Sequence, residues 1–288
     1  MNKLIILGHT GFLGKHLMSY FQSKKTFKSI IGFSSKDADL TDLTHLSRIA
    51  DKCNKDTIII MCAAIKSDEG NSLKTFQKNV RMAENISKLA LECKLKKLVL
   101  ISSNAVYGVH KKHKIISEET HVHPDTYYSL SKLVTERLLQ IGFAGEENKL
   151  IILRPSTLYG PGETITPHTP SGFLNTYLNG GIVTLWGDGS ELREFVFIDD
   201  MVRLVANIIE SEFNGILNIG GGQPRSYKDA LGIISKILDK DIEINSKPRT
   251  TEPVDKIYDL SLINFLFPDF QFTTLEKGLE LTYNRTET

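Results

Sequence analysis

The stretch KLIILGHTGFLG, residues 3–14, decides the fold of this chain. A mostly apolar run ends in glycines at positions 8, 11 and 14, and an amphipathic stretch follows from Phe12 to about Gln22. A strand that turns through glycines into a helix offers free N–H groups and the positive end of the helix dipole to a phosphate. We therefore predict that this turn binds the pyrophosphate of a dinucleotide.

Similar apolar runs recur along the first half of the chain, with helical stretches between them. They are SIIGF (29–33), TIIIMCAA (57–64), KLVLISS (97–103) and KLIILRP (149–155). Continuous apolar strands that alternate with helices indicate a parallel sheet buried on both faces. The predicted fold class is therefore α/β, a doubly wound parallel Rossmann-type sheet with its ligand at the carboxyl ends of the strands.

The second half of the chain has a different texture, because residues 158–172 are rich in Gly, Pro and Thr. We predict a smaller C-terminal substrate-binding lobe there. The predicted dinucleotide-binding domain covers residues 1–164, with 192–220 returning to it, and residues 165–288 form mainly the substrate lobe. The remaining predicted elements are strands at 182–186, 194–198 and 216–222, a helix from Asp199 to about Ser211, and a last helix with a capping box of Thr273 and Glu276.

Composition excludes several classes of partner and site. The chain has 288 residues, 24% of them charged, and a net charge of +1, so we expect neither a nucleic-acid nor a membrane partner. Its three cysteines are scattered and no C-x-x-C or H-E-x-x-H occurs, so we expect no metal site. No apolar run reaches about 18 residues and no signal peptide precedes the first strand, which favours a cytoplasmic location.

Tyr128 and Lys132 lie four residues apart in TYYSLSK, and therefore on one face of a helix. A nearby ammonium favours the phenolate, so a tyrosine of pKa about 10 becomes a proton carrier that works near neutral pH. The neighbouring Tyr127 has no lysine four residues further on.

Together, the motifs GHTGFLG, ISSNAVYG, YYSLSK, RPSTLYGPG and WGDGSELREFVFIDD resemble the extended short-chain dehydrogenase/reductase family, the NAD-dependent epimerase/dehydratase type that modifies sugar nucleotides. The resemblance covers most of the chain. It implies an NAD(P)-dependent enzyme with a nucleoside-diphosphate sugar as substrate. It also implies a homodimer formed through the helices at about 72–93 and 126–141.

The resemblance assigns the catalytic roles to Ser103, Tyr128 and Lys132, with Asn79 either supporting the site or lying on the surface. The predicted cofactor-binding residues, besides Tyr128 and Lys132, are Gly8, Thr10, Gly11, Phe12, Leu13, Gly14, Ser34, Ser35, Lys36, Asp39, Leu40, Ala63, Ala64, Lys66 and Pro155. The predicted substrate-binding residues are Ser103, Asn104, Thr157, Arg193 and Arg249. Guanidinium groups suit a diphosphate. Thr157 stands where the family often has Asn. Trp186 either stacks on a base or fills the core of the lobe, and we favour the core.

The end of the second strand bears on the choice of nicotinamide cofactor. An acidic residue there would accept bonds from the adenosine ribose and select NAD. Here the strand ends in Ser34, Ser35 and Lys36, whose hydroxyls and ammonium suit the 2′-phosphate of NADP. Asp37 is close enough to oppose this, so we favour NADP and leave NAD open.

The expected reaction is reduction of a 4-keto sugar nucleotide. A UDP-galactose 4-epimerase-like reaction with bound NAD⁺ would use the same residues and stays an alternative. A non-enzymatic dinucleotide sensor is a third possibility, although it would not need Ser103, Tyr128 and Lys132. Dehydration is disfavoured, because Asn104 and Ala105 replace the Asp-Glu pair that sugar dehydratases place after the catalytic Ser or Thr.

Overall fold

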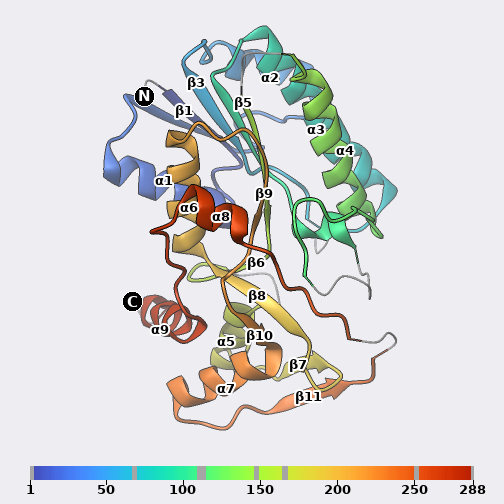
Figure 1. The fold of residues 1–288 in the computed structure, drawn as a ribbon, viewed down its shortest axis with the longest axis vertical. Coiled ribbons are helices and arrows are strands. Elements are labelled where there is room, and N and C mark those ends of the chain that lie inside the picture. Colours follow the sequence, from blue (N-terminus) through green and yellow to red (C-terminus); the bar gives the residue numbers. More distant parts are fainter. Residues whose placement is uncertain are drawn as a thin grey trace. The chain divides into compact units, whose positions relative to one another are not determined.

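The computed structural model describes residues 3–66, 70–108, 115–145, 149–163, 168–249 and 253–286. The chain forms two compact units (Figure 1). The first unit comprises 1–108, 121–154 and 205–217, and the second comprises 109–120, 155–204 and 218–288. The predicted domain boundary at residues 164 and 165 lies outside the described residues.

A six-stranded sheet in the order β2-β1-β3-β4-β5-β9 is the centre of the first unit. Its strands are β1 (Lys3–Leu7), β2 (Ser29–Phe33), β3 (Thr57–Met61), β4 (Lys97–Ile101), β5 (Lys149–Pro155) and β9 (Gly215–Ile219). The strands β1 to β5 pair in parallel. Because β1 lies between β2 and β3, the strand order reverses beside β1, which is where doubly wound sheets bind their ligand.

Helices cover both faces of this sheet. They are α1 (Phe12–Lys24), α2 (Leu43–Ala50), α3 (Leu73–Glu92) and α4 (Tyr127–Gly142). Figure 1 shows α1 on one side of the sheet and α2, α3 and α4 on the other. Buried side chains such as Ile49, Ile86 and Leu139 pack these three helices against Ile59 and Leu98 of the sheet. The predicted doubly wound, parallel Rossmann-type fold is confirmed.

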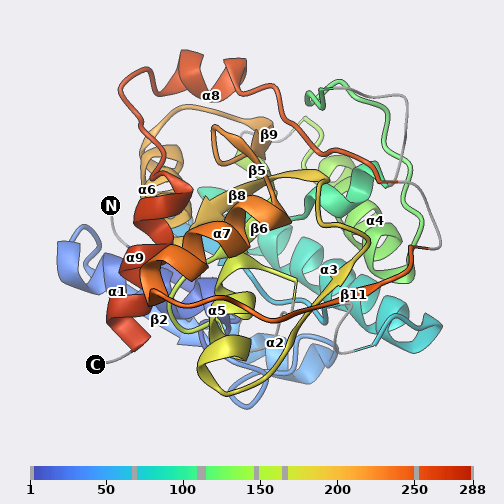
Figure 2. The same cartoon turned by 90° about the horizontal axis from the view of Figure 1, so that it is seen from below.

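The second unit holds two small sheets, β10-β8-β6 and β11-β7. Its elements are β6 (Thr157–Tyr159), α5 (Pro170–Leu178), β7 (Val183–Trp186), β8 (Leu192–Phe197), β10 (Pro224–Ser226), α7 (Tyr227–Leu238), β11 (Ile244–Lys247), α8 (Ser261–Leu266) and α9 (Leu275–Thr286). The helix α6 (Ile198–Glu210) begins in the second unit and ends in the first. Seen from below, α5, α7 and α9 pack against one another (Figure 2).

The start of α9 differs from its prediction. The hydroxyl of Thr273 donates to Asp200 at 2.8 Å, so it does not cap the helix. The hydroxyl of Thr274 accepts from the backbone N–H of Lys277 at 3.3 Å instead. The predicted capping box of Thr273 and Glu276 is therefore wrong, because a buried carboxylate on another helix competes for the first threonine. Within the described ranges, no helix has the length and apolarity needed to span a membrane.

Candidate functional site

The glycine turn between β1 and α1 has the geometry that an anion site needs. Gly8 has a φ of 84°, in the region that favours glycine. A side-chain carbon at Gly14 would lie 2.2 Å from the carbonyl oxygen of Gly8. The helix therefore packs so closely on the turn that only glycine fits at this position. Gly11 caps α1 and contributes no side-chain hydrogen bond, which leaves the first N–H groups of the helix open.

The neighbouring residues of this turn differ in exposure. Thr10 and Gly11 are exposed and Phe12 is half-buried, whereas the side chain of Leu13 is buried. Leu13 can therefore contribute to a ligand site only through its backbone.

The end of β3 lies directly against the glycine turn. A side-chain carbon at Gly8 would be 2.8 Å from the backbone nitrogen of Ala63, and the N–H of Cys62 donates to the carbonyl oxygen of Leu7 at 2.9 Å. Ala63 and Ala64 are half-buried, and Lys66 is exposed. The sequence-predicted residues after β1 and β3 therefore form one edge of the sheet.

The loop after β2 folds back on itself. The carboxylate of Asp37 accepts from the hydroxyl of Ser34 at 2.6 Å and from its N–H at 2.8 Å. These two hydrogen bonds hold the pKa of Asp37 below its ordinary value. Ser35 and Lys36 are exposed. The loop therefore carries a fixed negative charge next to the ammonium and hydroxyls that suggested a 2′-phosphate.

Asp39 and Leu40 have local roles in the same loop. The side chain of Asp39 accepts from the N–H and the hydroxyl of Thr41 at 2.9 and 2.8 Å. Leu40 is buried, and its carbonyl oxygen accepts from Asn85 at 2.8 Å. The side chain of Leu40 is therefore closed to a ligand, whereas Asp39 is exposed.

Lys132 is a buried cation at the carboxyl end of β4. Its Nζ donates to the carbonyl oxygen of Ile101 at 2.8 Å and lies 5.9 Å from the centre of the Tyr128 ring. Burial of the ammonium lowers the pKa of Lys132 to about 8, and the neighbouring Cys62 opposes this. Because Cys62 follows β3, Lys132 lies at the same sheet edge as the glycine turn.

Ser103 and Tyr128 approach this edge from two elements. Ser103 follows β4 and begins a short 3₁₀ helix, Asn104–Tyr107, where its Oγ accepts from the N–H of Ala105 at 3.1 Å. Tyr128 is half-buried in the first turn of α4, and its N–H donates to Asn71 at 3.2 Å. Asn104, the predicted substrate contact in this helix, is half-buried.

Asn79 braces the same region from α3. Its Oδ1 accepts from the N–H of Ile65 at 2.8 Å, while its Nδ2 donates to the carbonyl oxygen of Ile65 at 3.0 Å and to Ser131 at 3.2 Å. The residue is buried, so a plain surface position for Asn79 is wrong. It ties the segment after β3 to α4 at the residue before Lys132.

Sequence reasoning missed a buried ion pair between α4 and β5. Arg154 donates to both carboxylate oxygens of Glu136, at 3.1 and 2.7 Å, and to the hydroxyl of Tyr107 at 2.8 Å. Ser102 donates to the same carboxylate. Glu136 follows Lys132 by four residues, and this spacing was the available signal. The network fixes both ends of the turn that carries Ser103.

The two predicted substrate-binding arginines of the second unit lie against one acid, Glu191. Arg193 lies 3.9 Å from a carboxylate oxygen of Glu191, and Arg249 pairs with the other oxygen. Thr157 is half-buried on β6, and Pro155 is buried at the end of β5. Glu191 carries no motif of its own, so the sequence did not single it out.

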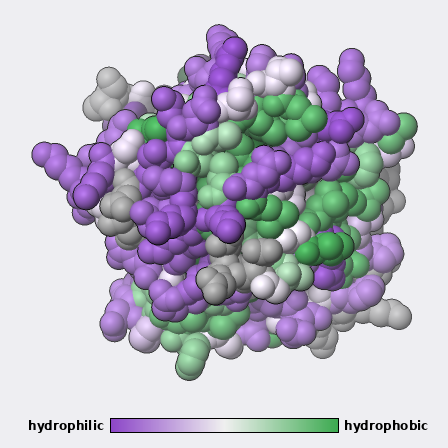
Figure 3. Space-filling model, turned by 90° about the horizontal axis from the view of Figure 1, so that it is seen from above, coloured by the Kyte–Doolittle hydropathy of each residue, from purple (hydrophilic) through white to green (hydrophobic). Residues whose placement is uncertain are grey.

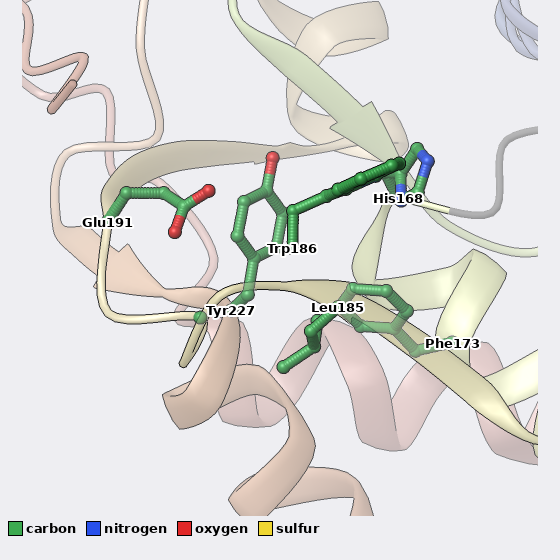
Figure 4. Close-up of a pocket in the computed structure, with 7 residues that line it drawn as sticks. His168, Phe173, Leu185, Trp186, Glu191 and Tyr227 are labelled. Carbon is green, nitrogen blue, oxygen red and sulfur yellow. The ribbon is translucent and has the colours of Figure 1, made fainter. Parts of the chain in front are cut away.

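A pocket of about 230 Å³ opens beside this acid, within the second unit (Figure 4). Its lining residues are His168, Phe173, Leu185, Trp186, Gly189, Glu191 and Tyr227. Trp186 is 47% exposed, so the expectation that it fills the core is wrong. Figure 4 shows the carboxylate of Glu191 at one side of the pocket, facing the ring of Tyr227, with Trp186 and His168 toward the other side. Among the residues that the structure describes, no cluster could hold a metal ion.

Known proteins resemble this chain over nearly its whole length. It is 24% identical to a GDP-6-deoxy-D-talose 4-dehydrogenase of Aggregatibacter actinomycetemcomitans, over 98% of this chain and 97% of that protein. A dTDP-4-dehydro-6-deoxy-D-allose reductase of Streptomyces sp is 22% identical over 97% and 94%. The UDP-glucuronic acid 4-epimerase of Bacillus cereus, solved with UDP-glucuronic acid and NAD, superposes with a TM-score of 0.86 at 24% identity, covering 99% of both chains.

The model of the NAD dependent epimerase/dehydratase family matches residues 4–220, which include the glycine turn, Ser103, Tyr128 and Lys132. The match covers well over half of the chain and contains all of the six-stranded sheet except Lys3. This chain belongs to the NAD dependent epimerase/dehydratase family.

Proposed function

We propose that this protein is an NAD(P)-dependent oxidoreductase that reduces a 4-keto nucleoside-diphosphate sugar. The observation that carries the proposal is the place of Lys132, buried one turn after Tyr128 at the sheet edge that also holds the glycine turn. The first unit would bind the dinucleotide and the second unit the nucleotide part of the substrate. Relatives named as a 4-dehydrogenase and as a 4-dehydro sugar reductase support a reaction at C4.

The residues of the first unit fit a nicotinamide dinucleotide, because the open N-terminus of α1 and the close approach at Gly14 match a pyrophosphate. When bound, the reduced cofactor supplies a hydride to the carbonyl carbon of the substrate. Tyr128 then donates its phenolic proton to the carbonyl oxygen, and Ser103 donates a hydrogen bond to the same oxygen as charge develops. Lys132 stabilises the resulting phenolate.

The 4-epimerase alternative uses the same groups in both directions, and a dinucleotide sensor uses only the glycine turn. Denaturing the purified protein and identifying any released dinucleotide separates these functions. The reductase is supported if the purified protein releases no dinucleotide, binds NADPH or NADH when it is added, and then reduces a 4-keto sugar nucleotide. Tightly retained NAD⁺ together with interconversion of C4 epimers supports the epimerase. If the protein binds the cofactor but converts no sugar nucleotide, the dinucleotide sensor is the remaining function.

The cofactor is a nicotinamide dinucleotide, and our proposal is that it carries the 2′-phosphate of NADP. Ser34, Ser35 and Lys36 favour NADP, whereas Asp37 places a carboxylate on Ser34, and the similar epimerase structure holds NAD. Titrating the protein with both dinucleotides at equal ionic strength measures the preference directly. A cytoplasmic location likewise stays a prediction.

The direct test of the mechanism is Tyr128→Phe. Loss of the proton donor should reduce turnover of 4-keto sugar nucleotides by about 100-fold or more, while the dissociation constant of the dinucleotide stays nearly unchanged. Tyr127→Phe is the matched control, because Tyr127 is exposed and has no lysine one turn further on. Equal turnover by the Tyr128 variant and the wild type would remove the proposed mechanism.

A further inference from the structure

Both arginines that the sequence assigned to a diphosphate already have an anion. Arg193 and Arg249 approach the two different oxygens of the Glu191 carboxylate. The Glu191 side chain is only 8% exposed, so water screens this charge poorly. The carboxylate also faces the pocket of the second unit, as Figure 4 shows. One acid thus occupies the place between the two cations.

The two arginines are held in position by contacts other than Glu191. Arg193 donates to the carbonyl oxygens of Leu192 at 2.8 Å and Val254 at 2.6 Å, and its guanidinium lies 5.6 Å from the centre of the Tyr227 ring. Arg249 packs so closely on Gly187 that a side-chain carbon there would lie 2.3 Å from its Nε. An anion that enters the site would therefore meet two arginines that are already in position and whose charge Glu191 already partly neutralises.

We propose that Glu191 is an internal counter-ion that stands in for the substrate diphosphate and must be displaced for the nucleotide sugar to bind. The inference rests on the function proposed above and adds a specificity determinant to its second unit. Two cations held this close would repel each other and lose hydration in the empty site, so a carboxylate between them stabilises the unliganded protein. A diphosphate carries one anionic group for each arginine, so it can replace the carboxylate at both cations.

The competition predicts that removing the charge of Glu191 strengthens anion binding. In Glu191→Gln, we expect inorganic pyrophosphate, UDP and GDP to bind about tenfold more tightly than in the wild type, as measured by calorimetry at fixed salt. Glu191→Asp retains the charge and should stay within about twofold of the wild type. Glu276→Gln is the matched control, because Glu276 pairs with Arg225 on the exposed surface of the same unit. Thermal unfolding of each variant shows whether it is folded.

The outcomes separate this inference from the proposed function. Tighter binding by folded Glu191→Gln, with Glu276→Gln unchanged, supports the counter-ion. Equal or weaker binding by Glu191→Gln, with nucleoside diphosphates still bound by the wild type, overturns the counter-ion and leaves the proposed substrate class intact. If neither protein binds pyrophosphate, UDP or GDP, both the counter-ion and a nucleoside-diphosphate substrate are wrong. A dinucleotide titration in the same samples reports on the first unit independently.

Discussion

At the scale of single residues, the buried ammonium of Lys132 has a cost that depends on pH. Burial lowers its pKa from 10.5 in the unfolded chain to about 8 in the folded protein. The unfolded state therefore binds the proton more tightly than the folded state between these two values. The penalty for burying the charge is fully present below about pH 8 and disappears as the pH rises toward 10.5. Holding a cation beside Tyr128 therefore lowers the stability of the folded protein at neutral pH.

This pH dependence predicts the behaviour of Lys132→Met without cofactor. The free energy of unfolding of the variant, relative to that of the wild type, should be higher at pH 7 than at pH 9.5. The reason is that the variant lacks the penalty for burying a charge, which the wild type carries at pH 7. The difference in the free energy of unfolding should change by roughly 2 kcal/mol between the two pH values. Urea unfolding at each pH measures it. A difference that does not depend on pH would contradict the burial of a charged Lys132.

The pair of Glu136 and Arg154 is the second residue-scale feature, since both side chains are nearly inaccessible, at 1% and 3%. Removing one partner leaves a buried charge unpaired, so Glu136→Gln should destabilise the protein by about 3–5 kcal/mol. Glu84→Gln, which breaks an exposed pair with Arg81, should cost about 0–1 kcal/mol. Urea unfolding of both variants tests the prediction. Similar losses in the two variants would show that the buried pair contributes no more than a surface pair.

At the scale of elements, α1 depends on its contact with the turn before it. The close approach of Gly14 to the carbonyl oxygen of Gly8 leaves no room for a methyl group. The N-terminus of α1 must move if any other residue stands there, and the phosphate site moves with it.

The prediction is that Gly14→Ala weakens dinucleotide binding at least tenfold and lowers the midpoint of thermal unfolding. Gly232→Ala is the control in another helix, α7, where an added side-chain carbon meets nothing within 4 Å. That variant should gain about 0.4–1 kcal/mol in stability and bind the dinucleotide as the wild type does. Fluorescence titration and thermal unfolding measure both effects. Unchanged binding by Gly14→Ala would show that the cofactor does not use this turn.

At the scale of the whole molecule, α3 and α4 carry large apolar side chains in solvent: Leu73, Tyr127, Leu130 and Ile141. On α4, Tyr127, Leu130 and Ile141 share one face at helical spacing. Figure 3 shows apolar side chains gathered toward the right of the view, the side on which Figure 1 draws α3 and α4. Exposed apolar patches of this kind are typical of contacts between subunits. We propose that this face pairs two copies of the chain.

If this face forms the dimer, a charged substitution within it should lower the molecular mass of the protein in solution. Wild-type protein should elute as a dimer in size-exclusion chromatography with light scattering, and Leu130→Glu and Ile141→Glu should shift it to the monomer. Phe265→Glu on α8 is the control, since Phe265 is 82% exposed and lies outside this face. A monomeric wild type would contradict the proposed dimer.

Much of the fold and of the candidate site follows from local sequence patterns. The order of apolar runs predicted the strands β1, β2, β3, β4 and β5 of the parallel sheet, and the spacing of glycines predicted the turn between β1 and α1. Both are local properties, because a strand or a turn is encoded within a few residues. The first turn of α9 was predicted incorrectly, since Asp200, distant along the chain, takes the hydroxyl of Thr273.

The amino-acid sequence by itself determined the fold class, the family and the face shared by Tyr128 and Lys132, because these follow from local patterns and from the order of those patterns along the chain. Only the tertiary structure decided which charges meet. Glu136 of α4 pairs with Arg154 of β5, and Glu191 lies between Arg193 and Arg249, which is distant along the chain. The pairs Glu136–Arg154 and Glu191–Arg249 join segments that only the fold brings together. The exposure of Trp186 was decided in the same way, by what the second unit leaves uncovered.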